Sequence, residues 1–190
     1  AGFQAVVVWQ LSQLVSLAMC ELPLPVACVP SWQEKQLRKL SPNVITFIDE
    51  PYMSSFGSAY VSLSREQAIT LMEEVLAGLT GIKGVHCCGN TDWSLLLATS
   101  VNVLNFDAYG FAETLALYSG DVKSFLDRGG ILAWGIVPTN FEPFEKESME
   151  SLERQLETNW TVLEKKGIDR QYLVTRSLLA PATCCLVNPD

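Results

Sequence analysis

Short apolar runs alternate with amphipathic segments over most of this chain. Five runs rich in β-branched and aromatic residues predict strands at residues 44–48, 82–86, 101–106, 131–137 and 172–179. Before the first strand and between the others, apolar residues recur at helical spacing. This spacing predicts one helix that ends near residue 40 and further helices at residues 92–98, 110–126 and 144–166. The pattern is therefore strand, helix, strand along the chain.

One further helix carries a clear start signal. Ser64 and Gln67 have the spacing of a capping box, in which each residue satisfies a backbone N–H near the other. The following helix would bury one face, formed by Ala68, Leu71, Met72, Val75 and Leu76. Gly167 is expected to end the helix over residues 144–166.

Strict alternation of strands and helices implies parallel strands joined by right-handed crossovers. The expected class is α/β, with a (β/α)8 barrel of the TIM type as the first expectation and a doubly wound sheet as the alternative. Five strands cannot close an eight-stranded barrel, so we expect only about the five C-terminal β/α units. Residues 1–190 are expected to form one partial barrel domain, with an atypical segment at 1–31 and regular units at 32–190.

The atypical segment contains no charged side chain in residues 1–20, but polar residues interrupt it. It lacks the basic start of a signal peptide and the apolar length of a membrane helix, so we expect a buried helix or a strand followed by a helix. The chain has a net charge of −8 and no basic cluster, which argues against nucleic-acid binding. Two vicinal pairs among its six cysteines suit a reducing cytoplasm better than a disulfide scaffold.

The most specific chemical signal is His86-Cys87-Cys88, which contains the single histidine of the chain. Residues i and i+2 of a strand point to the same side, so His86 and Cys88 could bind one metal ion. Nitrogen and sulfur ligands favour Zn²⁺. The alternative is a hydrogen-bonded histidine and a buried cysteine at a strand end. Cys87 is expected to point away from the metal and to pack as a small apolar residue.

These residues carry a family resemblance. Residues 43–51, NVITFIDEP, resemble a strand of cobalamin-independent methionine synthase, and His86-x-Cys88-Gly89-Asn90-Thr91 resembles its metal motif and that of corrinoid-linked methyltransferases. Residues 103–107 and 181–186 resemble the segments that supply its remaining ligands. The resemblance covers about residues 32–186 and implies the barrel superfamily shared with uroporphyrinogen decarboxylase.

By this resemblance, Zn²⁺ would be held by His86, Cys88, Asp107 and Cys184, with Cys185 as a rival to Cys184. Asp107 is shorter than the family's glutamate and could instead cap the helix near Gly110. Asp49 matches the aspartate that receives the amino group of homocysteine, although it could simply form a turn before Pro51. The implied activity is transfer of a methyl group to a thiol, most simply to homocysteine, giving methionine.

Two departures from the family affect the choice of donor and of function. The family's proton-transfer histidine is replaced by the segment 136–139, IVPT, which favours methylcobalamin over methyl-folate as donor. The upstream strands of the family are also not recognisable here. Three alternatives follow: a corrinoid-protein methyltransferase with another thiol acceptor, a decarboxylase-like enzyme, and an inactive barrel fragment that could dimerise to cover its open edges. Arg65, Arg128, Arg154 and Arg170 fall mostly on expected helices, which argues against a porphyrin site.

Overall fold

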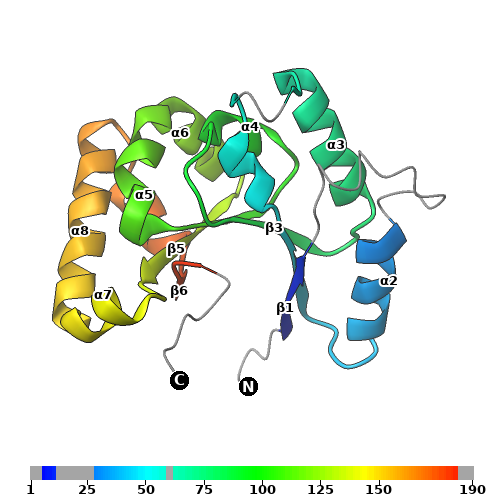
Figure 1. Cartoon of the computed structure of the whole chain (residues 1–190), viewed down its shortest axis with the longest axis horizontal. Coiled ribbons are helices and arrows are strands. Elements are labelled where there is room, and N and C mark those ends of the chain that lie inside the picture. Colours follow the sequence, from blue (N-terminus) through cyan, green and yellow to red (C-terminus); the bar gives the residue numbers. More distant parts are fainter. Residues whose placement is uncertain (1–5, 12–27, 59–61, 184–190) are drawn as a thin grey trace.

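A six-stranded parallel sheet organises the computed structural model (Figure 1). The structure describes residues 6–11, 28–58 and 62–183, and only the backbone of 6–11. The strands lie side by side in chain order, each hydrogen-bonded to the next. Their bounds are β1 Val6–Leu11, β2 Val44–Asp49, β3 Ile82–Cys87, β4 Val103–Phe106, β5 Ile131–Val137 and β6 Ser177–Pro181.

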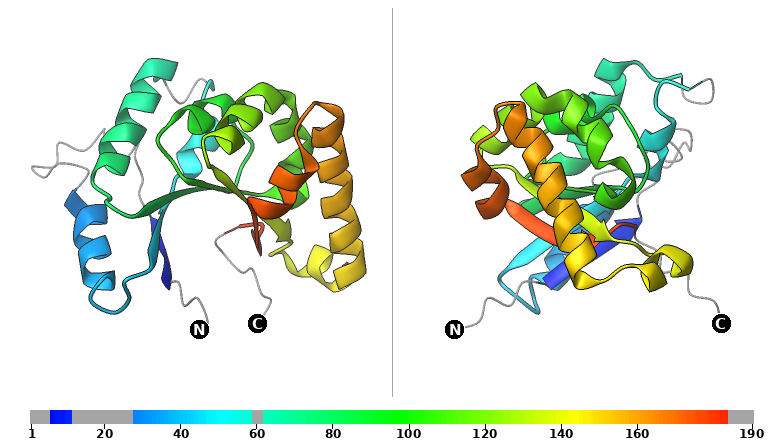
Figure 2. Two further views of the ribbon diagram at one scale, coloured as in Figure 1. Left: turned by 180° about the vertical axis from the view of Figure 1, so that it is seen from behind. Right: turned by 90° about the vertical axis from the view of Figure 1, so that its left-hand side faces the viewer.

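The helices form a layer on the outside of the curved sheet (Figures 1 and 2). The sheet bends beneath them, so that its other face is concave. The helices and 3₁₀ turns are α2 Cys28–Leu37, η1 Pro51–Ser55, α3 Arg65–Ala77, α4 Trp93–Ala98, α5 Ala108–Leu115, η2 Ala116–Tyr118, α6 Ser119–Asp127, α7 Phe141–Lys146, α8 Met149–Lys165 and α9 Arg170–Thr175.

The two faces of the sheet differ in what they bury. The main core joins outward strand residues such as Ile48, Val85 and Phe106 to apolar residues of the helices. Trp93 and Trp134 both make edge-on ring contacts with Phe106 at the centre of this core. The concave face carries a smaller cluster built from strand residues alone: Phe47, Val103 and Ala133, with Ile45 and Ile131 against them.

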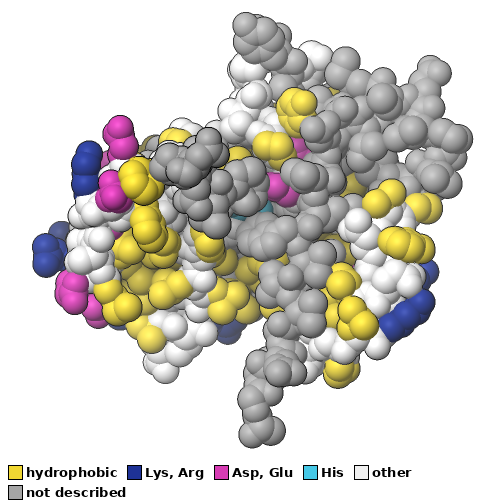
Figure 3. Space-filling view, turned by 60° about the horizontal axis from the view of Figure 1, so that its bottom comes forward, with side chains coloured by type: hydrophobic (Ala, Val, Ile, Leu, Met, Phe, Trp, Pro, Cys, Tyr) yellow, Lys and Arg dark blue, Asp and Glu magenta, His cyan; other side chains and the backbone are white. Residues whose placement is uncertain are grey.

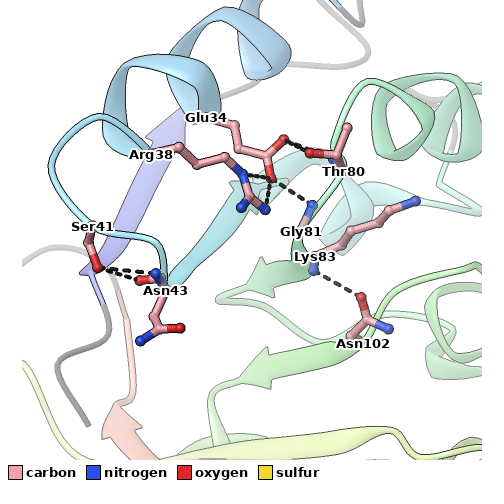
Figure 4. Close-up of polar contacts among 8 residues, drawn as sticks. All are labelled: Glu34, Arg38, Ser41, Asn43, Thr80, Gly81, Lys83 and Asn102. Carbon is pink, nitrogen blue, oxygen red and sulfur yellow. Dashed lines mark hydrogen bonds and ion pairs between the residues drawn. The ribbon is translucent and has the colours of Figure 1, made fainter.

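A buried carboxylate ties α2 to the amino-terminal end of β3 (Figure 4). Glu34, 2% exposed, accepts hydrogen bonds from the backbone N–H groups of Thr80 and Gly81, at 2.8 and 2.7 Å. The same carboxylate forms an ion pair with Arg38 at 3.0 Å. Both carboxylate oxygens are therefore hydrogen-bonded, which offsets the cost of burying the charge.

Several sequence predictions are confirmed. Ser64 and Gln67 form the complete capping box at the start of α3, and Ala68, Met72, Val75 and Leu76 of that helix are buried. Strand β5 has the predicted bounds. Gly167 follows α8 with a φ of +90°, a conformation that glycine adopts without steric cost.

The predicted strand over residues 172–179 is confirmed only from Ser177 onward, because its first part is helical. Asp169 caps α9 by accepting a hydrogen bond from the backbone N–H of Gln171 at 2.7 Å, and the strand begins only at Ser177. The aromatic and β-branched residues in this segment suggested a strand, but the cap and the packing of Leu173 in the core favour a helix.

Two long predicted helices are divided in the structure. The segment 110–126 forms α5, a 3₁₀ turn and α6. Within α5, Phe111 has non-helical backbone angles, with φ −131° and ψ 15°. The segment 144–166 divides because Ser148 and Ser151 form a second capping box, which starts α8 after α7 has ended. At Ser148, local capping therefore overrode a continuous apolar periodicity.

The count of five strands was also too low, since Val6–Leu11 of the atypical segment pairs in parallel with β2 as a sixth strand. Sequential strand order with helices on one face is the arrangement of a β/α barrel and not of a doubly wound sheet, whose order reverses at a switch point. The chain is thus a mixed α/β protein with the architecture of a partial β/α barrel. Within the described ranges, no helix has the length and apolar character needed to cross a bilayer.

Candidate functional site

Three polar residues occupy adjacent positions near the carboxyl ends of the central strands. Asp49 of β2 lies in register with His86 of β3, and His86 lies in register with Asn105 of β4. Asp49 and Asn105 each follow, by two residues, an apolar member of the concave-face cluster, Phe47 and Val103 respectively. Side chains two apart on a strand share a face, so the three residues form one polar row on the concave side.

A chain of hydrogen bonds fixes the ring of His86. Asn105 donates from Nδ2 to the backbone carbonyl of Ala133 at 3.0 Å, which orients its amide. Its Oδ1 then faces Nδ1 of His86 within hydrogen-bonding distance. Because an amide oxygen can only accept, Nδ1 of His86 must carry the proton, and in the neutral ring Nε2 carries the lone pair.

The surroundings of His86 favour its neutral form. Complete burial lowers the pKa of the imidazole, and this effect outweighs the opposing influence of the Asn105 hydrogen bond and of the carboxylates of Asp49 and Asp107. A neutral imidazole with its lone pair on Nε2 is the form that binds a metal or accepts a proton. A hydrogen bond to the other ring nitrogen is also the usual support of a metal-bound histidine.

Asp49 is the second buried polar group of the row. It is 2% exposed, and its Oδ1 has no hydrogen-bond partner among the described residues. A buried carboxylate oxygen is costly unless a donor or cation satisfies it. Asp49 is therefore suited to receive a positively charged or hydrogen-bonding group of a ligand.

The two adjacent cysteines differ in their surroundings, because neighbouring side chains of a strand point to opposite faces. Cys87 is fully buried in the core beneath the helices, as predicted, and its thiol donates to the carbonyl of Gly89 at 3.5 Å. Burial raises the pKa of Cys87 to about 12, which makes it a poor metal ligand. Cys88 follows the end of β3 and its thiol is partly exposed.

Asp107 forms a hydrogen bond with the backbone at the start of the next helix, α5. Its carboxylate accepts a hydrogen bond from the N–H of Gly110 at 2.7 Å and caps α5. Burial raises the pKa of Asp107, while backbone donors and the nearby His86 act in the opposite direction. The alternative role predicted for Asp107, as the cap of the helix near Gly110, is thus present in the structure.

Only some of the zinc ligands predicted from the sequence lie among the described residues. Cys184 and its rival Cys185 lie outside the described residues. Among the residues that are described, no group of three or more His, Cys, Asp or Glu side chains could hold a metal ion. His86, Cys88 and Asp107 are all described, so the structure does not bring these three predicted ligands together as a metal-binding group, although the donor chemistry of His86 fits a metal.

Sequence reasoning assigned no role to Asn105, which the structure places at the centre of the sheet beside His86. Asn105 is the one polar residue of the strand Val103–Phe106, and all four positions of that strand are buried. A polar amide inside an otherwise apolar strand is a signal that could have identified it.

Comparison of the sequence with models of known protein families and with curated proteins gives no match.

Proposed function

We propose that this chain is a zinc-dependent methyltransferase that moves a methyl group to a thiol, with homocysteine as the acceptor. The observation that carries the proposal is the hydrogen bond between Asn105 and His86, which leaves Nε2 of a buried, neutral histidine as an electron-pair donor at the carboxyl ends of the strands. The likeness of the His86-x-Cys88 segment to the family motif supports the same interpretation.

The metal would contribute one effect, which is to lower the pKa of the acceptor thiol so that the reactive thiolate is present at neutral pH. The proposed ligands are His86, Cys88, Asp107 and Cys184. Asn105 would hold the ring of His86 in one orientation and one tautomer. Asp49, buried beside His86, would receive the ammonium group of the amino acid and so position its sulfur.

The proposed donor is methylcobalamin or a methylated corrinoid protein. A folate donor leaves as a nitrogen anion that needs a proton, whereas a cobalamin donor leaves without one. The chain contains a single histidine, and that histidine is assigned to the metal, so none remains for proton transfer. Methylcobalamin is therefore the better match, and methyl-folate is the alternative.

The experiment is a methyl-transfer assay on zinc-loaded full-length protein, with each donor supplied separately and methionine measured by mass spectrometry. Asp49→Asn keeps the shape of the side chain and removes the charge that would bind the ammonium. We expect this variant to raise KM for homocysteine at least about tenfold. Turnover with the folate donor and none with methylcobalamin would overturn the choice of donor.

Two observations favour a second candidate, a non-catalytic barrel fragment. Asp107 already caps α5, and the described part of the chain holds no three-ligand metal group. A protein of this kind would bind no zinc and show no turnover with either donor. A decarboxylase-like role is less well supported, because Arg65 binds Asp92 and Ser94 and Arg128 binds backbone carbonyls within the helical layer.

A further inference from the structure

An apolar groove lies on the outer surface beside the last strand, remote from the polar row. It has a volume of about 770 Å³ and is lined by β5, β6, α8 and the end of α7. Three of its apolar side chains are largely exposed: Phe144 is 57%, Met149 81% and Leu179 67% exposed. Exposed apolar side chains gathered over adjoining elements are typical of an interaction surface.

The groove is open because of its place in the helical layer. Helix α8 packs on β5, and the short helix α9, which directly precedes β6, contacts that strand, but no helix follows β6 within the described residues (Figure 1). In a β/α barrel this position belongs to the helix of the next unit. The position of the groove therefore suits a helix.

The charged residues that line the groove are all acidic. Glu147, Glu153 and Glu157 line it, and none of the described lining residues is a lysine or an arginine. Glu157 forms an ion pair with Arg170, so part of its charge is neutralised. Hydrogen bonds from Ser151 and Tyr109 lower the pKa of Glu147, which keeps that group ionised. A complementary helix would have an apolar stripe bordered by basic residues.

The opposite end of the same molecule presents such a helix. On α2, Val29 is 49% exposed and Trp32 62%, and Leu40, just beyond the helix, is 81% exposed. With Gln36 these residues form one stripe at helical spacing, and Lys35 and Lys39 lie beside it. Lys39 donates to the side chain of Gln36 at 2.6 Å, which holds its charge along the stripe.

The two surfaces lie on opposite sides of the molecule. Figure 3 shows apolar side chains gathered over the α7–α8 side and, separately, over the α2 side, where basic side chains border them. Helix α2 packs on β2, close to the β1 edge of the sheet, and the groove adjoins β6, the other edge. One molecule therefore cannot bring its own α2 into its own groove.

We propose that the chain forms a reciprocal dimer in which α2 of each protomer occupies the groove of the other. The occupant is a second copy because the chain itself carries both complementary surfaces. Trp32 of one protomer would enter the apolar floor of the groove, and Lys35 and Lys39 would face Glu147 and Glu153 of the partner copy. Such a pair has closed two-fold symmetry, which limits assembly to a dimer.

The test is the mass of the full chain in sedimentation velocity from low micromolar to about 100 micromolar, a range that covers dimers of moderate affinity. The expected result is a species of twice the 21.0 kDa chain mass that increases with concentration. A monomer at every concentration would overturn the proposal and would leave a basic helix of another protein as the occupant to be sought.

Charge reversal makes the test specific to these surfaces. Lys35→Glu and Glu153→Lys should each weaken the dimer about tenfold or more, because both copies of the contact then bring like charges together. An equimolar mixture of the two variants should restore the dimer, since the mixed pair regains a contact between opposite charges.

The controls are Lys165→Glu and Glu113→Lys, which reverse exposed charges outside both surfaces and should leave the dimer unchanged. Circular dichroism should give the same spectrum for all variants, so that a loss of dimer is not a loss of fold. A dimer that survives both reversals, or a mixture that stays monomeric, would contradict the proposed contact.

Discussion

The amide of Asn105 accepts the Nδ1 proton of His86 and donates its own proton to the carbonyl of Ala133. This relationship fixes which nitrogen of the only histidine carries the lone pair, and it does so inside a fully buried part of the sheet. The proposed metal site depends on it, because the orientation of the ring would otherwise have to be selected when the metal binds.

Removing this support should weaken zinc binding. Asn105→Ala takes away the acceptor of the Nδ1 proton, and loss of such a partner typically lowers metal affinity about 10- to 100-fold. The affinity is measured by competition with a chromophoric chelator. Asn102→Ala is the matched control, because Asn102 binds the backbone of Lys83 near the opposite end of the same strands. Equal affinities of the two variants would show that Asn105 does not support the metal site.

The two adjacent thiols should react at very different rates. Cys87 is buried and its pKa is raised to about 12, so almost no thiolate is present near neutral pH. Cys88 is partly exposed and should be alkylated by iodoacetamide at least about tenfold faster in the metal-free protein. Peptide mass spectrometry locates the modified residue. Zinc should protect Cys88, and faster labelling of Cys87 would show that the two faces of β3 are assigned the wrong way round.

A methyl group at Gly135 should destabilise the β5–β6 pair. A Cβ there would lie 2.5 Å from the carbonyl oxygen of Phe106 and 2.8 Å from that of Pro181, and backbone atoms cannot move aside easily. Gly135→Ala should lower the free energy of unfolding by about 1–3 kcal/mol or more, measured by urea denaturation. At Gly120, in α6, a Cβ meets nothing within 4 Å, so Gly120→Ala should be neutral or stabilising.

The buried Glu34 carboxylate should make stability depend on pH. Burial alone would raise the pKa of Glu34, but hydrogen bonds from Thr80, Arg38 and Gly81 lower it below its ordinary value of 4.5. The folded state therefore holds the proton less tightly than the unfolded state. The resulting stability is fully present above about pH 5 and is lost as the pH falls through the folded pKa.

Glu34→Gln should accordingly be less stable than the unchanged protein by about 1–2 kcal/mol near neutral pH. The stabilities of the two proteins should converge as the pH falls through the lowered pKa of Glu34 in the folded state, because the glutamate then becomes protonated. Glu74→Gln, on the neighbouring helix α3, removes a carboxylate for which the described residues provide no ion pair, and its effect should be small. If the stability difference between the Glu34→Gln variant and the unchanged protein persisted in full at about pH 3.5, this assignment would be contradicted.

Much of the architecture was predictable because it follows from local periodicity. Parallel strands at residues 44–48 and 131–137 and the capping box at Ser64 are visible as patterns in the sequence, and the structure confirms them. Two features were not predicted: the division between α7 and α8, and the helix α9 after Asp169. Both depend on a capping side chain whose effect extends over only a few residues, so the spacing of apolar residues does not reveal them.

The candidate site was predictable only in part. The placement of His86 and Cys88 at a strand end follows from motif spacing, and the opposite orientation of Cys87 follows from strand alternation, whereas Asp107 was named only through the family resemblance. The role of Asn105 depends on register between β3 and β4, which arises from the packing of the whole sheet. The sixth strand, Val6–Leu11, is defined by its pairing with β2, so the sequence left two alternatives for its segment, a buried helix or a strand followed by a helix.

The most direct test of the proposed function is the zinc content of the full-length protein, measured by inductively coupled plasma mass spectrometry after dialysis against a weak chelator. About one zinc ion per chain is expected. Replacement of His86 or Cys88 by alanine should remove the ion, whereas Cys87→Ala should retain it. The absence of zinc from the unchanged protein near neutral pH, or its retention after replacement of His86, would contradict the proposed function.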